Sequence, residues 1–208
     1  MAGRLDLLKS LVRSATQASA ERLRDLKPVA NARKVLEELK ARRATLDEQM
    51  VSKALARAEG VRGVSVRLSD GRIGCDLSYD DGANLVFAVI PDQARFAPRG
   101  AKEVVFRVEP PEQVGDARVR EAVGTIAAAI ARALWGPVLG PRENDETALV
   151  EREGARLRAD LRSVPAVRSV LEGSPLAMAL DVIGIERFEI AERTLRFHIS
   201  LPMPPVGG

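Results

Sequence analysis

The sequence predicts an α+β fold: N-terminal helices, a curved antiparallel β-meander packed on a buried Ala-rich helix, then further helices and a C-terminal hairpin. Three observations predict this fold. Apolar residues recur at three- and four-residue steps through the first part of the chain, as they do in helices. They then alternate with a period of two around Asp70-Gly71, as they do in a hairpin. The stretch from Ala122 to Ala131 is apolar on almost every side, which is typical of a buried helix.

The N-terminal segment, residues 1–59, is predicted to be helical throughout. Pro28 divides it into two helices, and Gly60 ends the second with a residue that tolerates a left-handed conformation. The first helix, from about Leu5, is basic and amphipathic. The second carries apolar residues on one side, namely Val35, Leu36, Leu39, Leu46, Met50 and Leu55. Residues 60–208 are expected to form an α+β domain that is compact with residues 1–59.

The meander is predicted from alternation and turn residues. A hairpin runs from Val64 to Tyr79, with Asp70-Gly71 as its tight turn. Further strands follow over Leu85–Ile90 and Glu103–Val108, separated by turns rich in aspartate, glycine and proline. Such a meander has one apolar face, which must be covered.

Pro110-Pro111 ends the predicted sheet, and Asp116 is placed to cap a helix that runs to about Leu134. After a loop, we expect a charged helix that carries Leu149, Leu157, Leu161 and Val164 and leads to Pro165. A shorter helix is expected over Val167–Leu171.

A weak internal repeat appears when the sequence is shifted by 122 positions. Ser52–Gly60 then lies over Ser174–Val182, and the apolar residues of the two hairpins coincide without a gap. We interpret this as two units, each a helix followed by a hairpin. The coinciding residues are Val66, Leu68, Ile73, Cys75, Leu77 and Tyr79 over Phe188, Ile190, Leu195, Phe197, Ile199 and Leu201.

Composition limits the classes of partner. Hydrophobic residues make up 46% of the chain, which favours a packed protein over a disordered one. The net charge is only +3, its signs are interspersed, and aromatic residues make up 3%, so nucleic acid is not expected as a partner. The start of the chain lacks the apolar core of a secretory signal, no stretch reaches the roughly 20 apolar residues of a membrane span, and Cys75 is the only cysteine. We therefore expect a soluble, cytoplasmic protein.

The side chains of catalysis are scarce. His198 is the only histidine and is predicted to lie on the polar face of the last strand, while Cys75 lies on an apolar face. A single chain with one of each cannot assemble a triad or a transition-metal site. Carboxylate pairs such as Asp80-Asp81 are better explained by turns and helix starts, and no glycine-rich loop has the ending of a phosphate-binding P-loop. We therefore predict no enzyme activity, no cofactor and no metal.

Apolar surface remains to be assigned, and two interpretations stay open. The inner face of the sheet and the Ala-rich helix either fill each other or leave an apolar groove. The groove would bind a ligand through Val66, Leu68, Ile73, Leu77, Tyr79, Phe87, Val89, Phe106, Ile126, Ile130, Phe197 and Ile199.

The segment Gly63–Ile73, with its apolar-x-apolar pattern, Asp-Gly turn and basic-apolar continuation, resembles the bacterial branch of the tubular lipid-binding (TULIP-like) superfamily. Ile185–Leu201 is a second, poorer match. Members of this superfamily wrap a sheet around a long helix to enclose an acyl-chain groove. The resemblance covers about a quarter of the chain and implies binding of a lipid or another apolar small molecule.

The expected function is therefore that of a non-catalytic hydrophobic-ligand or lipid-binding protein. The alternative is a structural or regulatory protein–protein interaction module that self-associates through its N-terminal helices, whose leucines suit helix pairing. The first of these helices is basic and amphipathic. It would pack on the rest of the same chain, as surface helices ordinarily do, or on another helix or the surface of a membrane.

Overall fold

The computed structural model describes residues 43–97, 100–136, 139, 146–173, 184–191 and 193–200. The helices predicted before residue 43 lie outside these residues, as does the helix predicted for the second repeat over residues 174–182. Within the described ranges the protein has the predicted α+β fold, built from two antiparallel sheets and three α-helices.

The larger sheet has six strands. Their order is β2 (Val61–Ser69), β3 (Arg72–Tyr79), β4 (Asn84–Phe96), β5 (Lys102–Glu109), β7 (Arg156–Asp160) and β6 (Leu149–Glu153). The smaller sheet has the order β1 (Arg43–Asp47), β9 (Thr194–Ser200) and β8 (Gly184–Ala191). The helices are α3 (Glu48–Leu55), α4 (Ala117–Trp135) and α5 (Pro165–Gly173), with short 3-10 turns η1 (Pro111–Gly115) and η2 (Leu161–Ser163).

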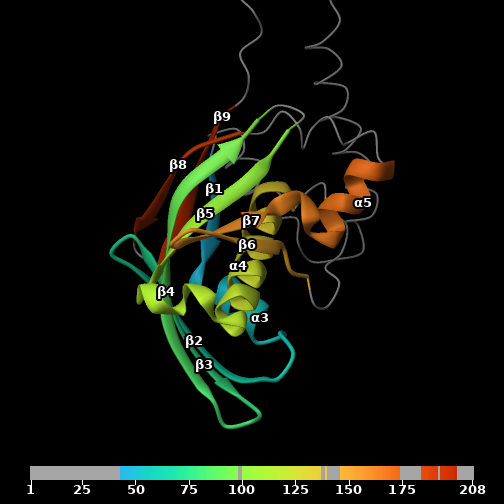
Figure 1. The fold of residues 1–208 in the computed structure, drawn as a ribbon. Coiled ribbons are helices and arrows are strands. Elements are labelled where there is room, and N and C mark those ends of the chain that lie inside the picture. Colours follow the sequence, from blue (N-terminus) through green and yellow to red (C-terminus); the bar gives the residue numbers. More distant parts are fainter. Residues whose placement is uncertain are drawn as a thin grey trace, which may run out of the picture.

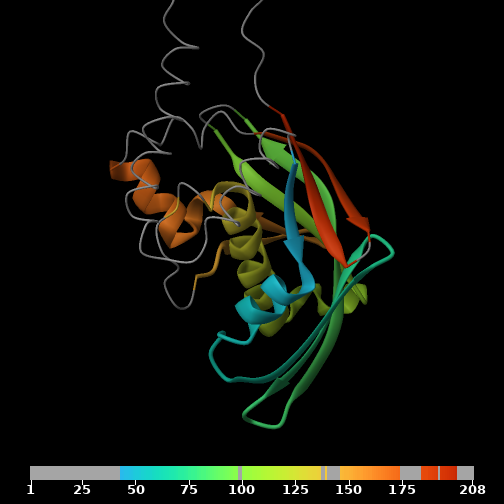
Figure 2. The same ribbon diagram turned by 180° about the vertical axis from the view of Figure 1, so that it is seen from behind.

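Helix α4 lies on the concave side of the curved strands β2 to β5 (Figure 1). Strand β1 and helix α3 lie beside it in the reverse view (Figure 2). Asp116 caps α4 as predicted, since its Oδ1 accepts from the backbone N–H groups of Arg118 at 2.7 Å and Val119 at 3.2 Å. Gly124 lets the chain pass close by, because a Cβ there would lie 2.7 Å from the Ala148 carbonyl oxygen. The prediction of a buried Ala-rich helix under a meander is confirmed.

The prediction of helix throughout residues 1–59 is wrong at residues 43–47, which form strand β1. This strand pairs with β9, with Leu46 opposite Leu195, and it buries Ala44 and Leu46 on its inner face. The tertiary pairing overrides the helical propensity of these residues, because β9 satisfies the backbone of β1 and the core accepts its apolar side chains. Asp47 then caps α3 by accepting from the Met50 N–H at 2.7 Å. Helix α3 ends at Leu55, before Gly60.

The charged helix predicted to precede Pro165 is also wrong. Residues 149–160 form the hairpin β6–β7 with Gly154 in its turn at φ +63°, and residues 161–163 form η2. The leucine spacing fits a helix, but Leu157 and Ala159 are both fully buried on one face of β7, which is a period of two. The shorter helix expected over Val167–Leu171 is present within α5.

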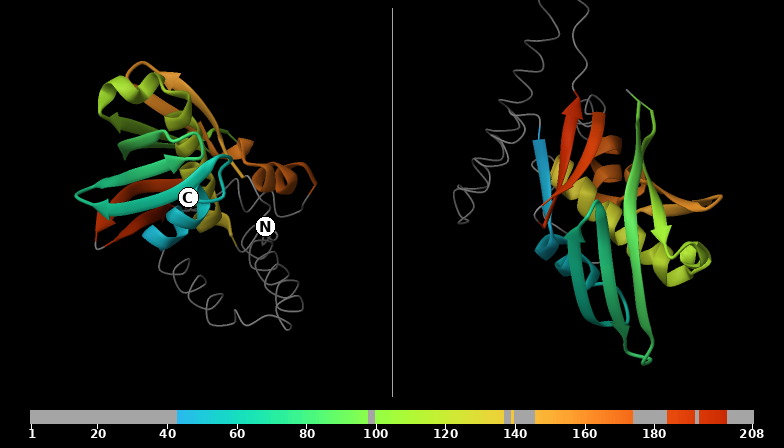
Figure 3. Two further views of the ribbon diagram at one scale, coloured as in Figure 1. Left: turned by 90° about the horizontal axis from the view of Figure 1, so that it is seen from below. Right: turned by 90° about the vertical axis from the view of Figure 1, so that its left-hand side faces the viewer.

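The two repeated hairpins are both present, and their registers coincide near the turn. Ser69 pairs with Arg72 across one turn, and Ala191 pairs with Thr194 across the other, 122 residues further along the chain. The registers then differ by one residue beyond the irregularity between Ile185 and Arg187. Figure 3 shows the smaller sheet, with β1, β9 and β8 side by side, next to the β2–β3 hairpin. The predicted recurrence of the hairpin pattern is therefore confirmed.

Candidate functional site

The predicted ligand-binding residues come together in one cluster on the inner faces of both sheets and on α4. Eleven of the twelve are at most 9% exposed, and only Val66 is half-buried. Ile73, Val89, Phe106, Ile126, Ile130 and Phe197 have no exposed surface at all. Side chains that a solvent molecule cannot touch are covered by other protein atoms, so these residues form a packed core in this conformation.

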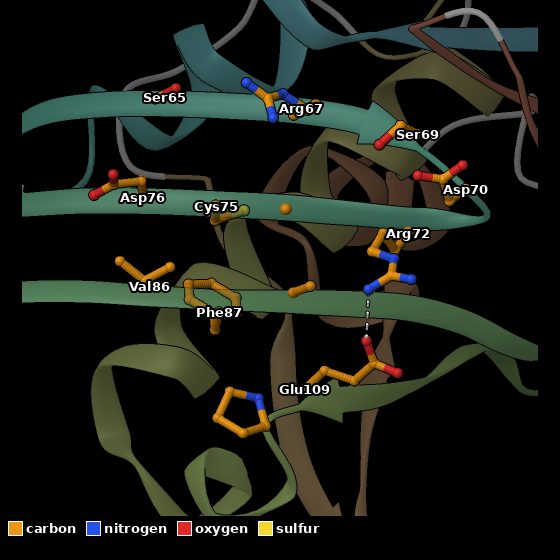
Figure 4. Close-up of a pocket in the computed structure, with 13 residues that line it drawn as sticks. Ser65, Arg67, Ser69, Asp70, Arg72, Cys75, Asp76, Val86, Phe87 and Glu109 are labelled. Carbon is orange, nitrogen blue, oxygen red and sulfur yellow. Dashed lines mark hydrogen bonds and ion pairs between the residues drawn. The ribbon is translucent and has the colours of Figure 1, made fainter.

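The outer face of the same sheet carries a hollow of about 740 Å³ over strands β2, β3 and β4 (Figure 4). We call it the outer hollow. Its volume falls in the range of ligand and peptide sites. It is lined by Ser65, Arg67, Ser69, Asp70, Arg72, Gly74, Cys75, Asp76, Val86, Phe87, Ala88, Glu109 and Pro110.

The floor of the outer hollow consists of small residues in adjacent strands. Gly74 on β3 lies beside Arg67 on β2 and beside Ala88 on β4. A Cβ at Gly74 would meet only the Arg67 carbonyl oxygen, at 3.7 Å, which is an ordinary contact. Its φ is not in the left-handed region either. Neither backbone conformation nor space requires glycine here, and glycine weakens the interior of a strand. The missing side chain therefore has one evident consequence, the open floor.

Three charged side chains of the outer hollow have no ionic partner. Within the part of the chain that the structure describes, Arg67, Asp70 and Asp76 form neither a side-chain hydrogen bond nor a salt bridge, and all three are exposed. Arg72 and Glu109, by contrast, pair across the hollow at 3.3 Å. Arg67 acts only at longer range, as one of the charges that lower the pKa of Glu48.

The other half of the sheet's outer surface differs, because most of its charges are paired, although exposed Arg107 of β5 has no ion pair among the described residues. These pairs join Arg95 to Glu153, Arg156 to Asp92, and Arg158 to both Glu103 and Glu151. A surface whose charges already satisfy one another offers few free groups to a partner. The combination of an unpaired cation with unpaired anions is thus a local feature of the outer hollow.

An apolar side chain stands at the edge of the outer hollow. Val86 is 62% exposed, and it is one of three large apolar side chains that the described residues leave exposed. Its backbone is fixed, because the Gln113 side chain of η1 donates to the Val86 carbonyl oxygen at 3.1 Å. Val86 therefore adds exposed apolar surface beside Asp76, which is its partner on β3.

The side chains considered for catalysis have structural partners. His198 Nε2 lies 3.1 Å from Glu189 Oε2 on the smaller sheet, and this contact is the main cause that lowers the pKa of Glu189. Cys75 belongs to the larger sheet, where burial raises its pKa to about 12. Such a thiol is almost entirely protonated at neutral pH and is a poor nucleophile.

The carboxylates are similarly engaged. Asp81 pairs with Arg118, and buried Glu146 pairs with Arg132 of α4. Among the residues that the structure describes, no group of His, Cys, Asp and Glu side chains is arranged to hold a metal ion.

The outer hollow was missed from the sequence, although one signal was available. Gly74 interrupts the strand Arg72–Tyr79 at a position where no turn requires glycine. Its neighbours Ala88 and Glu109 become visible only once strands β3, β4 and β5 are aligned.

Comparisons of the chain with protein-family models, with curated proteins and with solved structures found no match. None of the described helices combines the length and the apolar character needed to cross a bilayer.

Proposed function

We propose that this protein is a non-catalytic, cytoplasmic protein-interaction module whose binding surface is the outer hollow. The observation that carries the proposal is the contrast between the two faces of one sheet. The inner apolar face is packed into the core, where residues such as Ile73 and Val89 are fully buried. The outer face keeps an unfilled floor at Gly74, the unpaired charges of Arg67 and Asp76, and exposed Val86.

The chemistry of the outer hollow favours a protein partner over a small substrate. It is an open surface, and its free groups are one cation, two anions and one apolar side chain. Such a set can orient a chain of mixed charge, but it contains no nucleophile with an adjacent base. Cys75 contributes no such group, because its thiol is buried and protonated.

Filling the floor tests this function. In Gly74→Tyr an aromatic ring would occupy the hollow, and aromatic residues are favoured in strands. In the matched control, Arg107→Tyr, the new ring lies on exposed surface of β5 outside the hollow. Each full-length protein is immobilised, and proteins retained from an extract of the source cells are identified and then titrated in purified form.

We expect a partner that binds the unmodified protein and Arg107→Tyr but loses at least roughly tenfold in affinity for Gly74→Tyr, a difference of about 1.4 kcal/mol. Circular dichroism must show that all three proteins are folded. If every retained protein binds Gly74→Tyr as tightly as the unmodified chain, the outer hollow is not the binding surface.

Lipid binding is the second candidate, and one observation favours it. Helix α4 contacts strands of both sheets, namely β1 of the smaller sheet and β4, β6 and β7 of the larger one, and it also contacts α3. This is the wrapped-helix arrangement that the TULIP-like resemblance implies. An acyl chain would have to displace core side chains such as Ile126 and Phe106, which are fully buried.

Two measurements test the lipid candidate. Mass spectrometry of an organic extract of the purified protein should find a stoichiometric lipid, and a fluorescent fatty acid should bind and be displaced. Ile126→Phe, which adds bulk on the buried surface of α4, should weaken that binding. If neither co-purifying nor displaceable lipid is found, the candidate fails.

A further inference from the structure

The outer hollow has a property that points to its partner: it contains both members of an ion pair and keeps them apart. Arg67 and Asp76 are on adjacent strands, but they are not opposite each other. Gly74 is the residue opposite Arg67, and Ser65 is the residue opposite Asp76. The two charges thus stand diagonally across β2 and β3 (Figure 4).

A surface with this arrangement is complementary to itself. In a two-fold symmetric dimer the same patch contributes to both sides, so each contact between two different residues occurs twice. Consider a two-fold axis that is parallel to the sheet, passes midway between Arg67 and Asp76, and is perpendicular to the line that joins them. Rotation by half a turn about this axis places Arg67 of a second copy opposite Asp76 of the first, and Asp76 of the second copy opposite Arg67 of the first. The register puts Gly74 and then Ala88 close to that same axis.

The small residues then determine how closely the sheets approach. Because Gly74 has no side chain and Ala88 has only a methyl group, the centres of two such faces can meet without a steric barrier. Asp76 has Ser65 of β2 on one side and Val86 of β4 on the other. Val86 therefore lies away from the axis. In the reversed copy it falls near the aliphatic stem of Arg67, which would cover its exposed surface.

We propose that the outer hollow binds the outer hollow of a second copy of this chain, with Arg67 of each copy paired to Asp76 of the partner subunit. The inference rests on the proposed function and names its partner. The paired charges on the remainder of the outer surface, such as those of Arg95 and Glu153, leave this region as the one with free groups of both signs among the described strands of the sheet.

Charge reversal gives a test that only a symmetric pair can pass. Full-length Arg67→Asp has acidic residues at both positions, and Asp76→Arg has basic residues at both. Alone, each variant would bring like charges together twice in the dimer, which costs affinity at both contacts. Mixed in equal amounts, the two variants would form a heterodimer in which both contacts are restored.

The measurement is sedimentation velocity, supported by light scattering. We expect the unmodified protein to dimerise, each variant alone to have a dissociation constant raised roughly a hundredfold, and the equimolar mixture to recover the unmodified value. The double variant in one chain should also recover it. Circular dichroism of each variant confirms folding, and both substitutions fall on exposed positions.

Three results would overturn the inference: a monomer at the highest soluble concentration, dimers unaffected by either substitution, or a mixture that does not associate. Unaffected dimers would assign self-association to another surface, such as the N-terminal segment. If the protein is a monomer that still captures a protein partner in a Gly74-dependent manner, the dimer is wrong and the proposed function stands. If it is a monomer and captures no such partner, both proposals are wrong.

Discussion

Neighbouring residues of β3 show how alternation assigns different roles to consecutive side chains. Cys75 is 3% exposed and packs in the core, whereas Gly74, one residue earlier, faces the outer hollow. The inward position of Cys75 was predicted from the period of two. The role of Gly74 was not, since a missing side chain leaves no apolar signal to count.

Gly74 provides the first prediction at this scale. Gly74→Thr should raise the free energy of unfolding by about 0.5–1 kcal/mol, because threonine loses less backbone freedom on folding and is favoured in strands. The comparison is Gly71→Thr in the hairpin turn, where φ is +75°. A β-branched residue is strained there, so that variant should be destabilised. Urea unfolding measures whether each substitution raises or lowers the free energy of unfolding. A destabilised Gly74→Thr would contradict the conclusion that neither backbone conformation nor space requires glycine at position 74.

Cys75 gives a prediction about alkaline pH. Burial raises its pKa to about 12, above the value of about 8.5 for an unfolded thiol. Its contribution to stability is therefore fully present below about pH 8.5 and is lost as pH rises towards 12. The free energy of unfolding of the unmodified protein should fall more steeply above pH 8.5 than that of Cys75→Val, by up to about 1.4 kcal/mol per pH unit. Parallel curves for the two proteins would show that the thiol ionises normally.

At the scale of elements, Glu48 joins the ends of the two repeated hairpins. Its carboxylate accepts from the Leu68 N–H at 2.9 Å and from Arg193 Nε at 2.6 Å. Its own N–H donates to the Arg193 carbonyl oxygen at 3.3 Å. Helix α3 therefore starts at the point where β2 and the β8–β9 turn meet. The match of two hairpins in sequence did not predict this junction, because Glu48 belongs to neither hairpin.

The junction should respond to acid. The backbone hydrogen bond from Leu68, with help from Arg193, holds the pKa of Glu48 below its ordinary value despite opposing burial. A lowered pKa means stability that is present above the unfolded pKa of about 4.3 and is lost as pH falls through the folded value. Glu48→Gln should be roughly 1 kcal/mol less stable than the unmodified protein at pH 7, and this difference should shrink below pH 4. The control is Glu112→Gln, a substitution on exposed η1. A difference that does not change with pH would contradict the ionic role of Glu48.

At the scale of the whole molecule, the first described strand belongs to the core. Leu46 of β1 is fully buried, and the strand lies beside α4 as well as β9. Residues 43–59 are therefore packed with the elements that follow them. Trp135, the single tryptophan, lies at the far end of α4 and is 1% exposed, so it reports on the state of the helix.

Leu46→Ala tests this integration. We expect a loss of about 2–5 kcal/mol, because the substitution leaves a cavity in a packed core. The loss should appear in the urea transition followed by Trp135 fluorescence, since unfolding of a small single core is cooperative. Met50→Ala, at a side chain that is 40% exposed, serves as the control and should change little. An unchanged Trp135 transition in Leu46→Ala would mean that β1 unfolds separately.

The inward faces of the main hairpins and the start of α4 could both be predicted from the sequence. Both depend on local chemistry: the period of two of side chains such as Leu68 and Ile73, and the oxygen of Asp116 that accepts from two N–H groups. The tertiary structure was needed to show that residues 43–47 and 156–160 are strands, because their partners β9 and β5 lie far away in sequence, whereas β6 pairs only with the adjacent β7. It also decided that the inner face is a filled core and that the open surface lies outside, over Gly74. Alternation distinguishes two faces of a sheet, but what covers each face depends on the packing of elements that are distant in the chain.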